Sequence, residues 1–291
     1  MTRCKRTCLT VAIVLGLLRC RTVTPTEIQP SASPTLASPF PLPPTLPPSP
    51  TSTQTATPTV EPTPVAVSVH YQTAFGIDYT DPEQYLEQGE QSQISDPTVL
   101  DSVRTQEQSM AHLGRIYRWL HSEFTHNSDG GRSIGAVTVD QLLVERQLGG
   151  CHDYALVYAA VVRHLGYPAV MADSYSIAWI EQFQAGEQDG YVGHVFVEVH
   201  LAGKWVLVDP TNGWYVEDGY DPADPVIPLK GRIAGSSDEI YGYYVDRKGI
   251  DTWAYGITSC SELTQAMEEL AGQLDLEAIV YPEYEFEHYR R

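Results

Sequence analysis

"GGCHDYALVYAAVVRHLGYPA", residues 149–169, predicts a helix whose first residue is a cysteine. Side chains at intervals of three or four residues share one face of this helix. The residues on that face are Cys151, Ala155, Tyr158, Val162 and Leu165. Gly166 is well placed to end the helix, and Pro168 prevents its continuation. The segment therefore places Cys151 at a helix N-terminus.

That position favours a reactive thiol. The first turn of a helix presents unpaired backbone N–H groups and the positive end of the helix dipole. This environment favours the thiolate, which is the nucleophilic form of cysteine. The same N–H groups can stabilise an oxyanion that develops during acyl transfer. Gly149 and Gly150 allow a sharp backbone turn and keep other side chains away from the sulfur.

The strongest strand pattern lies in "HVFVEVHLAGKWVLVDPT", residues 194–211. Its alternating valines predict a hairpin with one face toward the core. If the loop has an even number of residues, such as Ala202-Gly203, then His194 and Asp209 lie on the same sheet face as near neighbours. An odd loop would separate them.

Cys151, His194 and Asp209 together supply the groups of a catalytic triad. A histidine that faces the thiol can form a thiolate–imidazolium pair and later protonate a leaving amine. A carboxylate behind the histidine holds the ring in the required tautomer.

The two quoted stretches resemble the transglutaminase-like superfamily of papain-like thiol enzymes. The first is similar to its G-x-C-x-[DE]-[YFH]-[AS] block, and the second to its H-x-[WF]-x-E-V and G-x-W-x-x-[VL/F]-D-P-[TS] blocks. The resemblance covers roughly residues 113–214 and implies an α+β fold, with the catalytic helix packed on an antiparallel sheet that carries the histidine and the aspartate. It implies Cys151, His194 and Asp209 as the catalytic triad. It is much less specific for the reaction, and it leaves the second oxyanion donor unplaced.

Further elements can be predicted around these blocks. One helix is predicted by the helical spacing of Leu113, Ile116, Tyr117 and Leu120. A second, short helix is predicted over residues 139–146. A third is predicted to begin after Ser259 and to run to about Leu274. "AVMADSY", residues 169–175, indicates a strand that leads into a loop over residues 178–193. Residues 278–289 are strand-like and are expected to close the sheet.

The chain before residue 65 has a different composition. Residues 1–21 combine basic residues with a short apolar run, which is typical of a secretory signal or membrane anchor. Cys20 follows that run and could carry a lipid, although Arg19 stands where lipoproteins have a small residue. Residues 22–64 are rich in Pro, Thr and Ser and predict a disordered stalk. We therefore expect residues 65–291 to be the folded domain, outside the cytoplasm, either secreted or anchored by the N-terminal segment.

The charge of the chain limits its partners. The formal net charge is −19, and five of the 18 basic residues lie before residue 65, so the domain itself is even more acidic. This excess argues against nucleic acid and anionic lipid surfaces as partners. We expect a peptide or protein amide substrate, with the cell envelope as one source, and membrane contact only through the N-terminal segment. No cofactor and no metal is expected, and the oligomeric state stays open.

Several residues admit a second interpretation. Cys151 could instead pair with Cys260 in a disulfide, or join His152 and Asp153 in a metal site. The acidic loop at residues 216–225 could bind calcium, although its Asp, Gly and Pro residues are also ordinary turn residues. An aromatic group could line a substrate groove or belong to the core. Its members are Tyr241, Tyr243, Tyr244, Trp253 and Tyr255.

Three functions compete at this point. The first is a cysteine-dependent hydrolase or acyltransferase that acts on amide bonds through a thioester. The second is a non-catalytic extracytoplasmic module that binds an extended peptide or glycan in the same cleft. The third is a scaffold part whose stalk and acidic surface matter more than any pocket. An intact triad favours the first, because a binding module has no need of all three groups.

Overall fold

The computed structural model describes residues 73–127, 134–187, 190–230 and 240–289. The expected leader, the expected stalk and the first residues of the expected domain lie outside these ranges. The helices are α1 (Met110–Glu123), α2 (Val139–Glu145), α3 (Cys151–His164), α4 (Ile177–Ala185) and α5 (Cys260–Gln273), with short 3-10 helices at Pro82–Leu86, Pro97–Leu100 and Leu276–Ala278. Within the described ranges, no helix is both long enough and apolar enough to cross a membrane.

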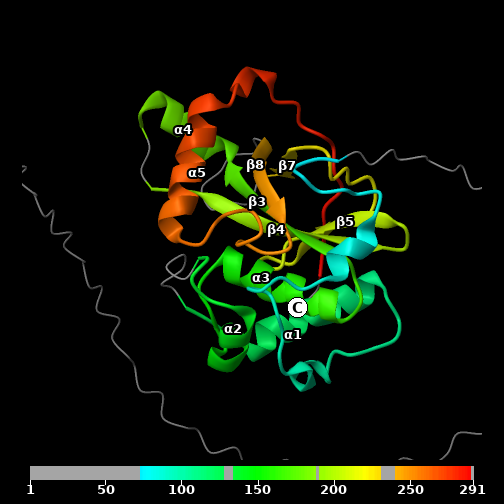
Figure 1. Cartoon of the computed structure of the whole chain (residues 1–291). Helices are drawn as coiled ribbons and strands as arrows, with labels where there is room; N and C mark the ends of the chain where they lie inside the picture. The colour runs from blue at the N-terminus through cyan, green and yellow to red at the C-terminus, as the bar shows by residue number, and fades with distance from the viewer. Residues whose placement is uncertain (1–72, 128–133, 188–189, 231–239, 290–291) are drawn as a thin grey trace, which may run out of the picture. The chain divides into compact units, whose positions relative to one another are not determined.

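The centre of the domain is a seven-stranded antiparallel sheet in the order β7-β8-β3-β4-β5-β6-β9 (Figure 1). Its strands are β3 (Ala169–Ser176), β4 (Gly193–Leu201), β5 (Lys204–Val208), β6 (Trp214–Val216), β7 (Val226–Lys230), β8 (Ile240–Gly249) and β9 (Glu287–His288). A separate parallel pair joins β1 (Thr125–His126) and β2 (Gln147–Leu148). The domain is thus an α+β fold, as the sequence predicted.

The hairpin of β4 and β5 closes with a two-residue turn. Ala202 and Gly203 both have positive φ values, 52° and 81°, which suits a tight hairpin with right-handed twist. Leu201 pairs with Lys204 directly across this turn. The loop is therefore even, and the alternation along the two strands places His194 and Asp209 on one face of the sheet.

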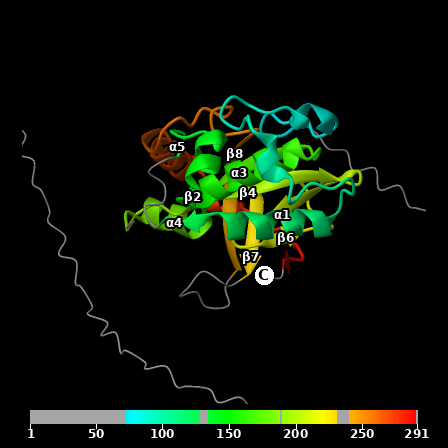
Figure 2. The same cartoon turned by 90° about the horizontal axis from the view of Figure 1, so that it is seen from below.

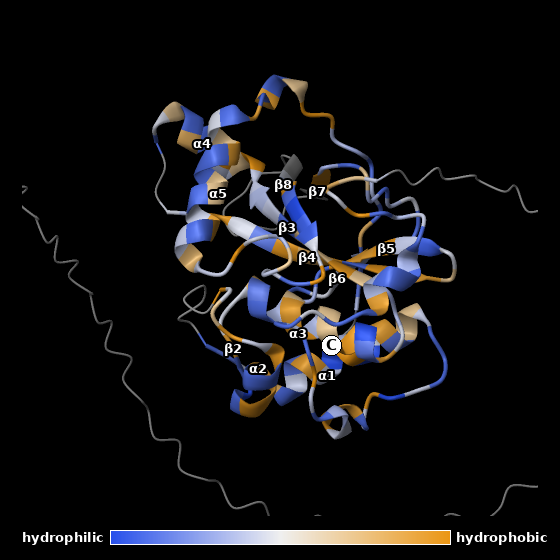
Figure 3. Cartoon of the chain, in the orientation of Figure 1, coloured by the Kyte–Doolittle hydropathy of each residue, from blue (hydrophilic) through white to orange (hydrophobic). Residues whose placement is uncertain are grey.

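The helices α1, α2 and α3 pack together on one side of this sheet (Figures 1 and 2). Val195, Val197 and Val199 of β4 belong to the core on this side, together with most of the buried face of α3. Figure 3 shows hydrophobic residues along α1, α3 and β5. Burying both partners of this contact fixes α3, and with it Cys151, relative to β4.

The other side of the sheet is covered largely by irregular segments. Phe196 and Leu207 pack there against residues from both ends of the described chain, such as Tyr79 and Phe286. Glu198 is also buried on this side and accepts hydrogen bonds from the Tyr79 hydroxyl at 2.7 Å and from Lys248 Nζ at 2.5 Å. A charge in such a place needs partners of this kind.

Two predictions of secondary structure were wrong or only partly right. Residues 178–193 were expected to form a loop, but α4 occupies their first half. Ser176 caps this helix by accepting a hydrogen bond from the Trp179 N–H, and Gly186 ends it with a positive φ of 72°. At the C-terminal end, only β9 of the expected strand joins the sheet, beside β6.

Candidate active site

The Cys151 thiol lies at the first residue of α3 and is half-buried. The preceding turn is closed by Asp153, whose carboxylate accepts a hydrogen bond from the Gly149 N–H at 2.6 Å. The carboxylate also lies near the positive end of the helix dipole, where a negative charge is favourable. The sequence predicted this position of the cysteine at the start of a helix.

His194 and Asp209 meet on the face of the sheet opposite α3. The last register pair of the hairpin is Val197 with Val208, so Asp209 is one residue beyond it and His194 is its diagonal neighbour on the same face. His194 Nε2 lies 3.0 Å from Asp209 Oδ1, and both side chains are buried. The distance is that of an ion pair, but Nε2 makes no hydrogen bond of good geometry among the described residues. The other ring nitrogen is left for the thiol.

Asp209 is held rigidly by the turn that follows it. Its Oδ1 accepts the backbone N–H groups of Thr211 and Asn212, each at 2.9 Å, and its Oδ2 accepts the Asn212 side-chain amide at 2.9 Å. These contacts fix the carboxylate before the histidine is considered. The turn at residues 209–212 therefore holds the Asp209 carboxylate in place beside His194.

The charges of the site reinforce one another. Burial alone would raise the pKa of the Cys151 thiol, but His152 and His194 outweigh it and lower that pKa from 9.0 to about 6. Burial alone would lower the pKa of His194, but Asp209 and the thiol raise it from 6.5 to about 10. For Asp209, the His194 ring and the Asn212 donors outweigh burial, so its pKa lies below 3.8. These shifts favour a thiolate beside an imidazolium near neutral pH.

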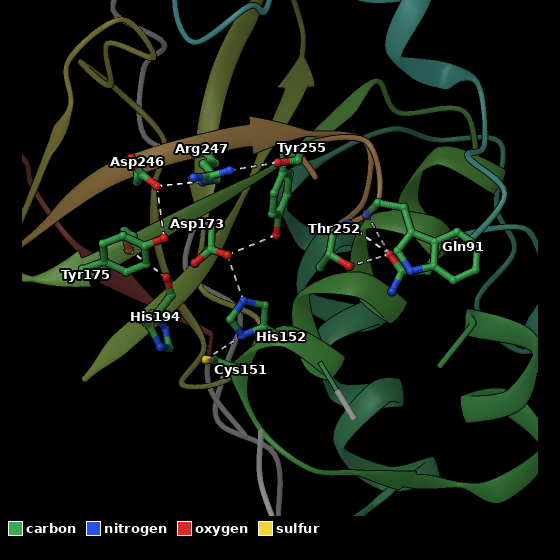
Figure 4. Close-up of polar contacts among 12 residues, drawn as sticks. Gln91, Cys151, His152, Asp173, Tyr175, His194, Asp246, Arg247, Thr252 and Tyr255 are labelled. Atoms are coloured by element: carbon green, nitrogen blue, oxygen red, sulfur yellow. Dashed lines mark hydrogen bonds and ion pairs between the residues drawn. The ribbon is translucent and has the colours of Figure 1, made fainter. Parts of the chain in front are cut away.

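A second histidine, His152, also contacts the thiol. Its Nδ1 lies 3.9 Å from Cys151 Sγ, and its Nε2 lies 2.9 Å from Asp173 Oδ2 in β3 (Figure 4). Sequence reasoning did not find this pair, although two signals were available. His152 follows the nucleophile directly, and Asp173 is the one carboxylate within the otherwise uncharged "AVMADSY" strand.

A pocket of about 400 Å³ opens onto the thiol. Cys151, His152 and Asp173 lie on one side of it, and residues of α5, including Met267, lie on another. Most of its remaining lining is apolar, and such a shape suits a side chain of a bound peptide next to the reacting carbonyl.

The structure also bears on the disulfide, metal-site and aromatic-groove interpretations of these residues. The two cysteines within the described ranges, Cys151 and Cys260, are both free, although both line the pocket. Within those ranges, no three or more His, Cys, Asp or Glu side chains are grouped so as to hold a metal ion. Tyr243 belongs to the core, with its ring 5.5 Å from that of His194, and the Tyr255 hydroxyl donates to Asp173 Oδ2 at 3.3 Å. The side chain of Tyr241 lies outside the described residues.

Known proteins provide a comparison for this arrangement. The solved structures that are similar to the chain include a protein from Cytophaga hutchinsonii described as a candidate cysteine protease, with 17% identity over 62% of this chain and 52% of that chain and a TM-score of 0.41. They also include the periplasmic domain of TgpA from Pseudomonas aeruginosa bound to ethylmercury, with 23% identity over 46% of this chain and 50% of that chain and a TM-score of 0.32. LapG from Legionella pneumophila has 10% identity over 60% of this chain and 84% of that chain, with a TM-score of 0.30. All three similarities are weak, and the chain matches about half the length of the first. No curated protein matches the chain.

A family comparison is more informative. The model of the transglutaminase-like superfamily matches residues 97–210, a range that begins before α1 and ends directly after Asp209. It includes the thiol, both histidines that contact it and both of their carboxylates. Residues 97–210 of this chain therefore form a domain of the transglutaminase-like superfamily.

Proposed function

We propose that the protein is a cysteine-dependent acyl enzyme that acts on amide bonds of peptide or protein substrates, with Cys151 as nucleophile, His194 as proton carrier and Asp209 as the orienting carboxylate. The observation that carries this proposal is the thiol at the first turn of α3, beside the buried 3.0 Å ion pair of His194 and Asp209. The match of this region to the transglutaminase-like superfamily supports it.

The proposed reaction has two halves. In the first, the Cys151 thiolate attacks the amide carbonyl carbon, the C–N bond breaks, and the departing ammonia or amine takes the proton of His194, which leaves a thioester. In the second, water or an amine attacks the thioester, His194 takes a proton from it, and the C–S bond breaks. Water gives a carboxylic acid, as in a peptidase or amidase, and an amine gives a new amide, as in a cross-linking transferase.

The charges of the site match what this sequence of steps requires. A nucleophile with a pKa of about 6 is ionised at neutral pH, and an imidazole with a pKa of about 10 still holds the proton that the leaving amine must receive. Backbone N–H groups at the start of α3 are available to the oxyanion. The pocket beside the thiol offers space for the acyl group.

The decisive experiment is trapping of the thioester. The full chain is incubated with a glutamine-containing peptide and a labelled primary amine, and intact-mass spectrometry follows the enzyme while chromatography follows the peptide. We expect an acyl adduct on Cys151 in the wild type and none in Cys151→Ala, while Cys260→Ala retains it. Release of free acid identifies a hydrolase, and incorporation of the amine identifies a transferase. A wild-type chain that forms neither adduct nor product over a panel of peptides would favour a binding module.

We further propose that residues 1–21 direct the chain out of the cytoplasm, that residues 22–64 are a stalk, and that residues 65–291 are the catalytic domain. The support is compositional: a basic and apolar start, then a Pro, Thr and Ser-rich stretch with almost no charge. Limited proteolysis of the full chain is expected to remove the stalk first and leave a stable fragment that begins between about residues 65 and 100. A protected stalk would show that the boundary is wrong.

A further inference from the structure

Cys151 lies between two imidazole–carboxylate pairs rather than beside one. His194 with Asp209 is the first pair, and His152 with Asp173 is the second. The ion-pair distances are nearly equal, 3.0 Å and 2.9 Å, and all four side chains are buried. A single histidine–carboxylate pair is enough for acyl transfer, so the second pair needs its own explanation.

The two pairs reach the thiol from opposite faces of the sheet. Asp173 is directly opposite Val195 in the register of β3 and β4, and Val195 faces the core under α3. His194 is the residue directly before Val195 in β4 and points to the other face, beside the ring of Phe196. Residues opposite each other across a strand pair share a face. Both pairs meet at one sulfur atom where the start of α3 lies beside the first residues of β4.

The surroundings of Asp173 favour a positive charge on His152. The Asp173 side chain is almost fully buried, its Oδ1 has no hydrogen-bond partner among the described residues, and Oδ2 contacts only His152 and the Tyr255 hydroxyl. A buried carboxylate is costly unless a positive group is paired with it. Burial alone would lower the pKa of His152, but Asp173 and Cys151 outweigh it and raise that pKa well above 6.5.

The other titratable groups around the two pairs do not replace this cation. Arg247 of β8 lies beside Asp173 in the register, but its guanidinium donates to Asp246 at 2.8 Å and to the Tyr255 carbonyl at 3.3 Å (Figure 4). Asp153 is bound to the Gly149 N–H. The tyrosines that face the two pairs from β3, β8 and the segment after it are Tyr175, Tyr243 and Tyr255, and the pKa of each is raised by burial, so they are neutral at ordinary pH.

We propose that His152, held by Asp173, is a second imidazolium that stabilises the Cys151 thiolate, so that the thiolate does not depend on His194 alone. The inference rests on the proposed function, because it assigns His152 to the same nucleophile. Asp173 is then a positioning residue that acts through the His152 ring. His152 also lines the pocket at the thiol. One consequence is that His194 can give its proton to the leaving group while the sulfur keeps a cationic neighbour.

The test is the pH dependence of alkylation at Cys151 in the full chain. Iodoacetamide labelling is followed by peptide mass spectrometry, which resolves Cys151 from the other cysteines. Loss of an adjacent opposite charge raises a thiol pKa by about 1–3 pH units. We therefore expect His152→Gln to raise the labelling midpoint by at least about one pH unit and to slow labelling at pH 6 about tenfold or more. Asp173→Asn is expected to change the midpoint in the same direction, because the amide cannot keep the ring protonated.

The matched control is His112→Gln. His112 is also a buried histidine with both ring nitrogens engaged, by the Tyr167 hydroxyl at 2.6 Å and the Val103 carbonyl at 2.7 Å, but it lies outside the site. Its replacement is expected to lower the melting temperature without changing the midpoint. If His152→Gln behaves in the same way, the pair is only structural and the proposal is wrong.

Two further measurements on the wild-type chain keep the inference testable and separate its failure from failure of the proposed function. Ring ¹⁵N NMR of the wild-type chain is expected to show His152 protonated on both nitrogens between pH 6 and 8, and a neutral ring would overturn the proposal even if the variants do not fold. A wild-type midpoint near the ordinary cysteine value of about 8.5 would instead reject Cys151 as the activated nucleophile, and with it the proposed function. A low wild-type midpoint that His152→Gln leaves unchanged rejects this inference alone.

Discussion

The two histidine–carboxylate pairs at Cys151 differ more in how they are held than in their dimensions. Asp209 accepts three hydrogen bonds from the turn that follows it, two of them from backbone N–H groups. Asp173 stands inside a strand, and one of its oxygens has no partner among the described residues. The first carboxylate is therefore oriented by its own turn, whereas the second is oriented mainly by its histidine.

This difference separates two tasks. A proton carrier must be aimed precisely, because proton transfer depends on the geometry of the donor and acceptor. A group that only stabilises charge acts through Coulomb attraction, which falls slowly with distance in a buried site. The pair whose carboxylate is held by its own turn thus fits the proposed role in proton transfer, and the other pair fits the proposed role in electrostatic stabilisation.

The sharpest way to separate the two pairs is to remove each histidine in turn. We expect His194→Ala to lower single-turnover acylation on the order of 10³–10⁴-fold, because the leaving amine loses its proton donor. His152→Gln is expected to lower it about tenfold or less at pH 8, where much of the thiol is ionised without help. Equal losses in the two variants would show that the pairs share one task.

Replacing the carboxylate of the first pair is expected to have the next largest effect on single-turnover acylation. Asp209→Asn is nearly isosteric and should preserve the fold, as circular dichroism can check. It is expected to lower acylation about 10–10³-fold, because an amide cannot stabilise the imidazolium. The double variant with His194→Ala should be about as slow as His194→Ala alone, since the two groups act as a unit. Losses that multiply would place Asp209 outside this unit.

The pH profile of acylation follows from the ionised pair. Cys151 has a lowered pKa of about 6, so the thiolate forms as pH rises through that value. His194 has a raised pKa of about 10, so the imidazolium is lost as pH rises through that value. The rate constant is expected to be bell-shaped between these limits and to fall about tenfold from its plateau by pH 5. A rise only near pH 8 to 9 would show that the thiol is not ionised by its neighbours.

Removing one hydrogen bond from each carboxylate should give the smallest effects. Asn212→Ala removes the side-chain donor to Asp209 Oδ2 and is expected to slow acylation about tenfold or less, because the two backbone donors remain.

Tyr255→Phe removes the 3.3 Å contact to Asp173 Oδ2 and should change the pH midpoint of Cys151 labelling only slightly. A larger effect from Tyr255→Phe would mean that the second pair is held as rigidly as the first.

Several parts of this site could be predicted because they depend on local sequence. Helical spacing and the glycines at both ends of α3 predicted that Cys151 begins a helix. Period-two alternation predicted the faces of β4 and β5, but only on the condition of an even loop, which Ala202 and Gly203 satisfy. The helix α4 was missed, since residues 178–193 were predicted to be a loop. The Ser176 cap and the Gly186 end are local signals that could have revealed it.

By itself, the sequence determined that Cys151 begins a helix, that residues 194–209 form a hairpin, and that Cys151, His194 and Asp209 are the candidates for a triad. Only the tertiary structure decided that His152 and Asp173 meet, and that the two pairs approach one sulfur from opposite faces of the sheet. The physical reason is that spacing along a chain fixes which face of a helix or strand a side chain occupies, whereas contacts between elements depend on how α3 packs against β3 and β4. That packing is set by burial of the whole apolar surface, to which no short motif corresponds.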